Sequence, residues 1–154
     1  MAVVYLDTSA LVKRYALETG SKWIIALTSS ASGHDIFVGR LAGPEMIAAI
    51  FRKVKVKEVS RSKAAQIAQT FRSDWQTKYQ ILSVTSATAD QAMQLAEVYG
   101  LRGYDAVHLA TALVLQRVRL SAGFSNFTFV TADNDQLSAA LAEGLPAENP
   151  NNYS

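Results

Sequence analysis

Apolar residues follow two different spacings along this chain. Short apolar runs predict buried strands at 3–6, 36–38, 81–84 and 127–130, with a brief edge strand at 148–150. Elsewhere apolar residues recur every three or four positions and predict helices over 7–17, 20–27, 43–54, 60–78, 86–99, 103–115 and 136–142. Because strands and helices take turns, the expected fold class is α/β, with a central, mostly parallel sheet of four to five strands covered on both faces.

Local signals support several of these boundaries. Pro44 suits the first turn of a helix, and Gly100 is a residue type that ends one. Ser86 or Thr88 is the expected cap of the helix that Gly100 ends, and the small polar residues 29–33 predict a loop. The helix that begins at residue 103 is apolar on most of its faces, so we expect it to be the most buried helix. No repeat or linker divides the chain, and a single domain spanning 1–154 is expected.

Four acids fall where predicted helices begin: Asp7, Glu45, Asp105 and Asp133. Asp7 and Asp133 also follow predicted strands directly. Parallel sheets bind ligands outside the carboxyl ends of their strands, close to the point where the strand order reverses. The topology therefore predicts that these carboxylates meet at one edge of the sheet. Asp135, two residues after Asp133, is an alternative for the fourth position, and spacing does not rank the two.

Each of these acids also has an ordinary structural explanation as a helix cap or a first-turn acid. Together they are harder to explain, because two carboxylates ~5 Å apart repel by roughly 3 kcal/mol at an effective dielectric of ~20. A hard divalent cation relieves that repulsion, and ligands that offer only oxygen favour Mg²⁺ or Mn²⁺. His108, three residues after Asp105, is expected to be a packed histidine bonded close to the sheet and not a metal ligand.

Composition excludes several classes of protein. The 154 residues are 49% apolar and contain no cysteine, which excludes disulfides, cysteine nucleophiles and thiolate-bound zinc. No leader with a basic start and a long apolar run is visible, and no run approaches the ~18 apolar residues of a membrane span. We therefore expect a cytoplasmic protein without membrane segments. Walker, dinucleotide-binding and Gly-x-Ser-x-Gly motifs are also missing.

The net charge of +2 is small, but basic residues gather in one stretch. Within 52–63 only Glu58 opposes a set of six: Arg52, Lys53, Lys55, Lys57, Arg61 and Lys63. A solvated helix end would explain them, and so would a surface that contacts the phosphate backbone of a nucleic acid. Lys13, Arg14 and Arg40 are further candidates for such contacts.

Four segments, in this order, resemble the motifs of PIN domains, and especially of VapC-type toxins of toxin–antitoxin pairs. They are 4–13 (VYLDTSALVK), 44–46 (PEM), 101–112 (LRGYDAVHLATA) and 129–135 (FVTADND). The resemblance implies a three-layer α/β/α sandwich and RNA cleavage that depends on Mg²⁺ or Mn²⁺. It carries the metal-binding and catalytic roles to Asp7, Glu45, Asp105 and Asp133, with Asp135 as the alternative. Thr131 or Ser9 would supply supporting hydroxyls.

The resemblance also implies partners. Proteins of this kind are typically homodimers, and a small antitoxin neutralises them by placing its basic tail in the acidic groove. Three alternatives stay open at this point. They are a housekeeping RNA-processing nuclease, a non-catalytic partner-binding domain on the same fold, and a phosphotransfer domain in which Asp7 accepts the phosphoryl group.

Overall fold

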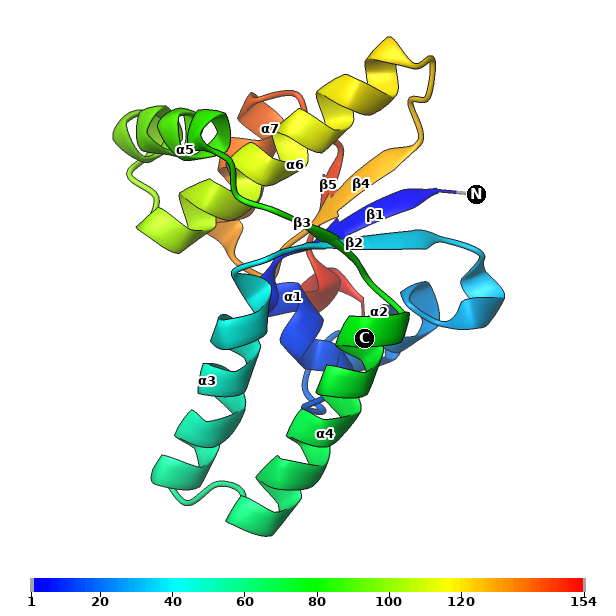
Figure 1. Cartoon of the computed structure of the whole chain (residues 1–154), viewed down its shortest axis with the longest axis vertical. Helices are drawn as coiled ribbons and strands as arrows, with labels where there is room; N and C mark the ends of the chain where they lie inside the picture. Colours follow the sequence, from blue (N-terminus) through cyan, green and yellow to red (C-terminus); the bar gives the residue numbers. More distant parts are fainter. Residues whose placement is uncertain (1, 154) are drawn as a thin grey trace.

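In the computed structural model, which describes residues 2–153, five parallel strands form one sheet in the order β3-β2-β1-β4-β5 (Figure 1). The strands are β1 (Val3–Leu6), β2 (Asp35–Gly39), β3 (Gln80–Leu82), β4 (Phe127–Val130) and β5 (Ala147–Glu148). β1 lies at the centre and is buried along its whole length. The predicted α/β class and parallel sheet are confirmed.

Helices cover both faces of the sheet, as the three-layer prediction requires (Figure 1). α5, α6 and α7 lie on one side, and α1 to α4 lie on the other. The helices are α1 (Thr8–Leu11), α2 (Ser21–Leu27), α3 (Ala42–Lys55), α4 (Arg61–Thr77), α5 (Ser86–Tyr99), α6 (Gly103–Ser121) and α7 (Asn134–Ala142). Short 3-10 turns form η1 (Val12–Arg14), η2 (Ser30–Ser32) and η3 (Pro150–Asn152).

Alternation along β1 divides the core in two. Val3 and Tyr5 point to the side of α5, α6 and α7, whereas Val4 and Leu6 point to the side of α1 to α4. α6 contributes the most to the first core, and its first half is buried nearly all round. The prediction that this helix is the most buried one is confirmed. No helix in residues 2–153 is long and apolar enough to cross a membrane.

Several predicted boundaries are wrong. The first helix ends at Leu11 and continues only as η1, because Leu17 at the end of its apolar pattern is 84% exposed and has no core to join. The cap of α5 is Thr85, whose Oγ1 accepts from the Thr88 N–H, so neither Ser86 nor Thr88 is the cap. Within the predicted loop 29–33, η2 forms one turn.

The other differences lie at the ends of elements. α6 runs six residues beyond the predicted end at 115, and α7 begins at Asn134 instead of 136. β3 stops at Leu82, whose register partner Gly39 is the last residue of β2. β5 ends before Pro150, which lacks a backbone N–H for the ladder and starts η3 instead.

The strand order reverses at β1. The chain builds β2 and β3 outward on one side of β1, then returns to add β4 and β5 on the other side. Leu6 and Val130 are register partners, so the residues after β1 and β4 emerge next to each other. This crevice is where a sheet of this kind binds its ligands.

Candidate active site

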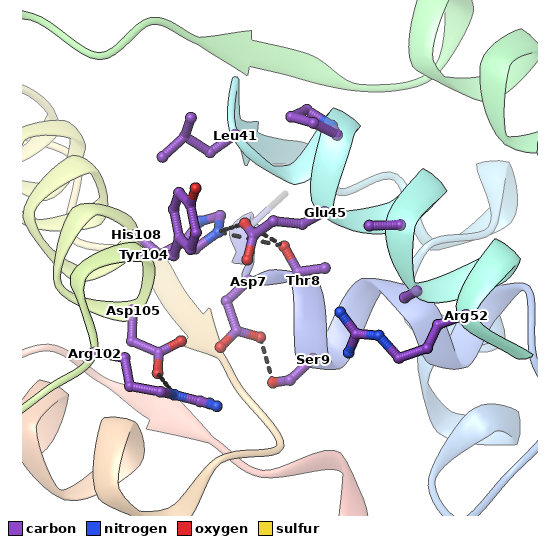
Figure 2. Close-up of a pocket in the computed structure, with 13 residues that line it drawn as sticks. Asp7, Thr8, Ser9, Leu41, Glu45, Arg52, Arg102, Tyr104, Asp105 and His108 are labelled. Carbon is purple, nitrogen blue, oxygen red and sulfur yellow. Dashed lines mark hydrogen bonds and ion pairs between the residues drawn. The ribbon is translucent and has the colours of Figure 1, made fainter. Parts of the chain in front are cut away.

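A cleft of about 550 Å³ opens at the carboxyl edge of the sheet, between α1, α3 and the start of α6 (Figure 2). Asp7, Glu45 and Asp105 line it, so the structure brings together three of the four predicted acids. The rest of the lining is Thr8, Ser9, Leu41, Pro44, Ala48, Ala49, Arg52, Arg102, Tyr104 and His108. Asp133 stands beside this lining and is connected to it through Arg102.

Asp7 follows β1 and caps α1. Its Oδ1 accepts from the Ala10 N–H at 3.0 Å and from the Ser9 hydroxyl at 2.7 Å. Only 2% of the residue is exposed. Burial raises the pKa of this carboxyl, although the charge of His108 and bonds from Thr131 and Ser9 pull the pKa down. Asp7 is therefore a fixed and poorly solvated carboxylate, whose charge a bound cation would stabilise.

Two hydroxyls join the end of β1 to the end of β4. Ser9 Oγ accepts from the Ala132 N–H at 2.9 Å and lies 3.3 Å from Thr131 Oγ1. Thr131 Oγ1 in turn accepts from the Asp133 N–H at 3.1 Å. Both hydroxyls that the sequence suggested thus lie beside the acids, where they fix the backbone that carries Asp133.

Glu45 lies in the first turn of α3 and reaches back toward α1 and α6. Its Oε1 accepts from the Thr8 hydroxyl at 2.9 Å and lies 2.6 Å from His108 Nε2 (Figure 2). Partial burial would raise the pKa of Glu45, but the bonds and charges of His108, with help from Thr8, lower it below the ordinary value. Glu45 is accordingly held in its ionised form.

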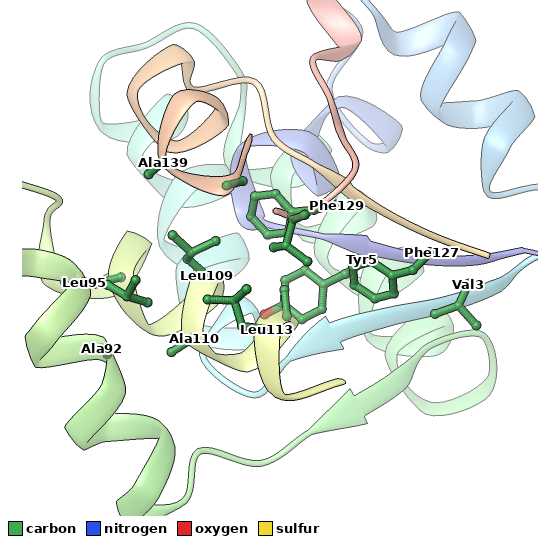
Figure 3. Packing of buried hydrophobic residues seen from close by; sticks show 14 residues of the cluster. Val3, Tyr5, Ala92, Leu95, Leu109, Ala110, Leu113, Phe127, Phe129 and Ala139 are labelled. Carbon is green, nitrogen blue, oxygen red and sulfur yellow. The ribbon is translucent and has the colours of Figure 1, made fainter. Parts of the chain in front are cut away.

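His108 itself is 2% exposed and lies between Glu45 and Tyr5. Its Nδ1 is 2.9 Å from the Tyr5 hydroxyl. Tyr5 is packed among core residues such as Phe129 and Leu109 (Figure 3). Burial and the nearby Asp7 raise the pKa of Tyr5 well above its ordinary value, so the phenol keeps its proton. On its other side, His108 Nε2 faces the Glu45 carboxylate, so the ring links the central strand to this acid.

Close packing explains why a glycine ends β2 at this point. A Cβ on Gly39 would lie 2.6 Å from the Tyr5 hydroxyl and 3.3 Å from His108 Nδ1. The expectation that His108 is a packed histidine is correct, but the sequence did not show that it touches Glu45. Tyr5 and Gly39 were not expected at the site at all. The only signal was the position of His108 one turn after Asp105, on the helix that meets this sheet.

Arg102 connects the remaining two acids. Its Nε donates to Asp105 Oδ2 at 3.0 Å, and its Nη2 lies 3.4 Å from Asp133 Oδ2. Asp133 uses its other oxygen to cap α7, accepting from the Gln136 N–H at 3.0 Å. Asp135 is exposed in the first turn of α7 and bonds to none of these side chains. The geometry thus favours Asp133 as the fourth acid, although its role stays a prediction.

As the side chains lie, no three Asp, Glu, Cys or His residues within 2–153 are arranged as a metal-binding group. In this arrangement Arg102 engages two of the acids and His108 a third. The donor set nevertheless suits Mg²⁺ or Mn²⁺, because it offers only carboxylate oxygens around a buried Asp7. The metal stays a prediction.

Two of the candidate RNA-binding cations do not face this cleft. Lys13 is 5% exposed and donates to Glu18 and to the Thr19 carbonyl. Arg14 bonds to Asp74 and Thr28 beneath α4. Both hold the fold together, so neither is free to contact a phosphate. Arg52, in contrast, lines the cleft.

Known proteins are similar to this chain in sequence and in fold. The family model of the PIN domain matches residues 4–142. Ribonuclease VapC45 and Ribonuclease VapC49, from two strains of Mycobacterium tuberculosis, are each 34% identical over 115 residues, covering 75% of this chain and 78% of each relative. A toxin-antitoxin complex from Klebsiella pneumoniae has a similar fold, with a TM-score of 0.64 at 16% identity, over 96% of this chain and 97% of that chain.

Proposed function

The chain belongs to the PIN domain family, and on that premise we propose that it is a metal-dependent endoribonuclease and the toxin of a toxin–antitoxin pair. The observation that carries the proposal is the meeting of Asp7, Glu45 and Asp105 in one cleft at the reversal of strand order. The similar proteins named as ribonucleases support RNA as the substrate.

The reaction is hydrolysis of an RNA phosphodiester. A water oxygen forms the new bond to phosphorus, the bond from phosphorus to the 3′ oxygen breaks, and the products carry a 5′-phosphate and a 3′-hydroxyl. Glu45 or Asp133 orients the attacking water, which loses a proton as the 3′ oxygen gains one. Glu45 suits this role because Thr8 and His108 fix its orientation and keep it ionised as a hydrogen-bond acceptor.

Asp7, Glu45, Asp105 and Asp133 would hold the ion. When bound, Mg²⁺ or Mn²⁺ polarises the scissile phosphate and lowers the pKa of the attacking water. The chain itself positions these acids: the α1 backbone and Ser9 fix Asp7, and Thr8 and His108 fix Glu45. Fixed carboxylates reduce the entropy lost when the substrate is aligned for attack.

Arg102 also suggests how an inhibitor works. One guanidinium from this chain already pairs with two of the acids. A basic side chain from a small antitoxin would pair with the same oxygens from outside. The structural similarity to a toxin-antitoxin complex is consistent with such a partner.

The test is cleavage of a mixed pool of structured RNAs by the purified protein, with Mg²⁺ or Mn²⁺ and with EDTA. Asp7→Asn and Asp105→Asn are compared in parallel. Cutting that requires metal and that both substitutions abolish is the expected result. Cutting that survives EDTA or both substitutions would contradict the proposal. No cutting and no Mn²⁺ binding would favour a non-catalytic binding domain.

A further inference from the structure

One face of α3 continues the wall of the cleft beyond the acids. Glu45, Ala48, Ala49 and Arg52 all line the cleft. Their spacing of three, four and seven residues places them on one side of the helix. The side chains of the two alanines are short, so a bound RNA strand can lie close to the helix. Figure 2 shows Arg52 reaching from α3 toward the cleft, on the far side of Ser9 from Asp7.

Positive charge continues from Arg52 to the tip of the α3–α4 hairpin, which stands away from the sheet (Figure 1). Six of the fifteen Lys and Arg residues fall within 52–63, against one of the thirteen acids, so the rest of the chain is net acidic. Beyond Arg52 the exposed members are Lys55, Lys57, Arg61 and Lys63. The charge is therefore a local feature of this hairpin and not a property of the whole surface.

Within residues 2–153, most of these cations form no ion pair. Lys53 pairs with Glu58 at 3.3 Å, and the Arg61 guanidinium lies over the Phe51 ring. In the described residues, no acid lies within ion-pair distance of Lys55, Lys57 or Lys63. Like charges collected at one tip repel each other, and a polyanion removes that repulsion.

Lys57 supplies a second observation. Its φ is +63°, which makes it the one residue besides glycine with a positive φ in residues 2–153. It follows the C-cap of α3, where the left-handed conformation usually falls to glycine because any Cβ is strained there. A lysine at this position accepts local strain and places an ammonium group at the tip of the hairpin.

We propose that the RNA strand leaves the cleft along α3 and crosses the α3–α4 turn, with its phosphates against Arg52, Lys55, Lys57 and Arg61. The proposal rests on the ribonuclease function proposed above and adds where the flanking nucleotides bind. From Glu45 to Lys55 the helix rises about 15 Å, which corresponds to roughly four phosphates at the ~3.4 Å spacing of a stacked strand. The contacts are electrostatic and therefore do not depend on base sequence.

The experiment measures RNA binding by the full chain with Asp7→Asn, which prevents cleavage. A sixteen-nucleotide RNA is compared with a trinucleotide that is too short to reach past the cleft. Lys55→Gln with Lys57→Gln removes two charges from the hairpin. Lys22→Gln with Arg117→Gln is the matched control, since it removes two exposed charges from α2 and from the far half of α6.

The ratio of long to short RNA affinity should fall roughly tenfold at 0.15 M salt in the hairpin variant and stay unchanged in the control. The slope of log affinity against log salt should become shallower by about 1.4, because each phosphate contact on a single strand contributes about 0.7. Lys57→Gly should relieve the backbone strain and raise Tm, and it should still weaken binding of the sixteen-nucleotide RNA.

If the ratio of long to short RNA affinity is the same in both double variants, the proposed RNA path along α3 is wrong. The proposed nuclease function would still stand, because cleavage by the wild type is measured separately. Weaker binding of an acidic polypeptide with unchanged RNA binding would assign the hairpin to a protein partner instead. If the chain neither binds nor cuts any RNA, the proposed function is wrong, and so is the proposed RNA path.

Discussion

Glu45 and His108 lie 63 positions apart in the sequence, and their side chains approach to 2.6 Å between Oε1 and Nε2. The contact joins the first turn of α3 to the most buried helix of the fold. Because His108 is also fixed by Tyr5, the orientation of an acid in the cleft depends on a side chain of the central strand. Stability and site geometry are therefore coupled through one imidazole ring.

Replacing His108 tests this coupling. His108→Ala should lower the free energy of unfolding by at least about 2 kcal/mol, because it removes the imidazole that bonds the buried Tyr5 hydroxyl and opens a cavity. Cleavage should fall 10- to 100-fold, the usual effect of losing a residue that orients a metal ligand. His108→Gln, whose amide can still donate to Glu45, should recover more activity than His108→Asn. Urea unfolding and initial cleavage rates give the two measurements, and equal activities for Gln and Asn would argue against an orienting role.

The crowding at Gly39 makes a second prediction. Gly39→Ala places a methyl group against the Tyr5 hydroxyl and should cost about 1–3 kcal/mol of stability as the ring is displaced. The same substitution should cost less in a Tyr5→Phe background, where the hydroxyl is absent. Gly103→Ala is the control, because a Cβ there meets nothing within 4 Å. The double-mutant cycle by thermal unfolding measures the coupling, and additive effects would show that the hydroxyl is not the obstacle.

Much of this site could be predicted from sequence because its acids have local signals. Asp7 follows a strand, and Glu45 and Asp105 lie in first turns of helices, so a parallel sheet was enough to bring them together. Asp133 follows β4 and caps α7, as its ordinary structural explanation predicts. The cap leaves room for the predicted site role, because Oδ1 caps the helix while Oδ2 lies toward Arg102.

The partners of these acids could not be predicted in the same way. The contact between Tyr5 and His108 spans 103 positions and depends on how α6 is rotated against the sheet. Apolar spacing sets which face of a helix is buried but not which side chain meets a given strand residue. Lys13 and Arg14 show the same limit, because nothing local distinguishes a solvated cation from one bonded inside the fold.

The burial of Asp7 predicts a conflict between stability and function. Asp7→Asn keeps an oxygen to cap α1 and removes a charge that burial disfavours, so Tm near pH 7 should rise, with about 2–4 °C for each kcal/mol. Cleavage should be lost. Addition of Mn²⁺ should raise Tm of the wild type but not of the variant, since an ion stabilises only the form that binds it.

The dependence of this difference on pH follows from the raised pKa of Asp7. The unfolded chain releases the proton near pH 3.9, before the folded chain does, so the cost of burial grows as pH rises through the folded pKa. The rise in Tm caused by Asp7→Asn should therefore be small at pH 3 and largest at neutral pH. A rise in Tm that does not change with pH would mean that the charge of Asp7 is not its cause.

Asp133 and Asp135 can be separated by matched substitutions. Asp133→Asn keeps the cap on Gln136 N–H, so Tm should change little while cleavage falls at least tenfold. Asp133→Ala should also lose about 0.5–2 kcal/mol of stability through the missing cap. Asp135→Asn should leave both quantities near the wild-type values, because Asp135 is exposed and bonds to no residue of the site. A loss of cleavage in Asp135→Asn alone would exchange the two assignments.

Arg102 is an internal cation that competes for the oxygens a metal would use. Its side chain is 81% exposed, so its ion pairs with Asp105 and Asp133 contribute little to stability, and Arg102→Gln should leave Tm nearly unchanged. Mn²⁺ should bind more tightly to the variant, because both carboxylates are released from the guanidinium. Titration calorimetry measures this affinity, with Arg117→Gln as a control for the lost charge. Weaker Mn²⁺ binding in Arg102→Gln would mean instead that the arginine holds the acids in place for the ion.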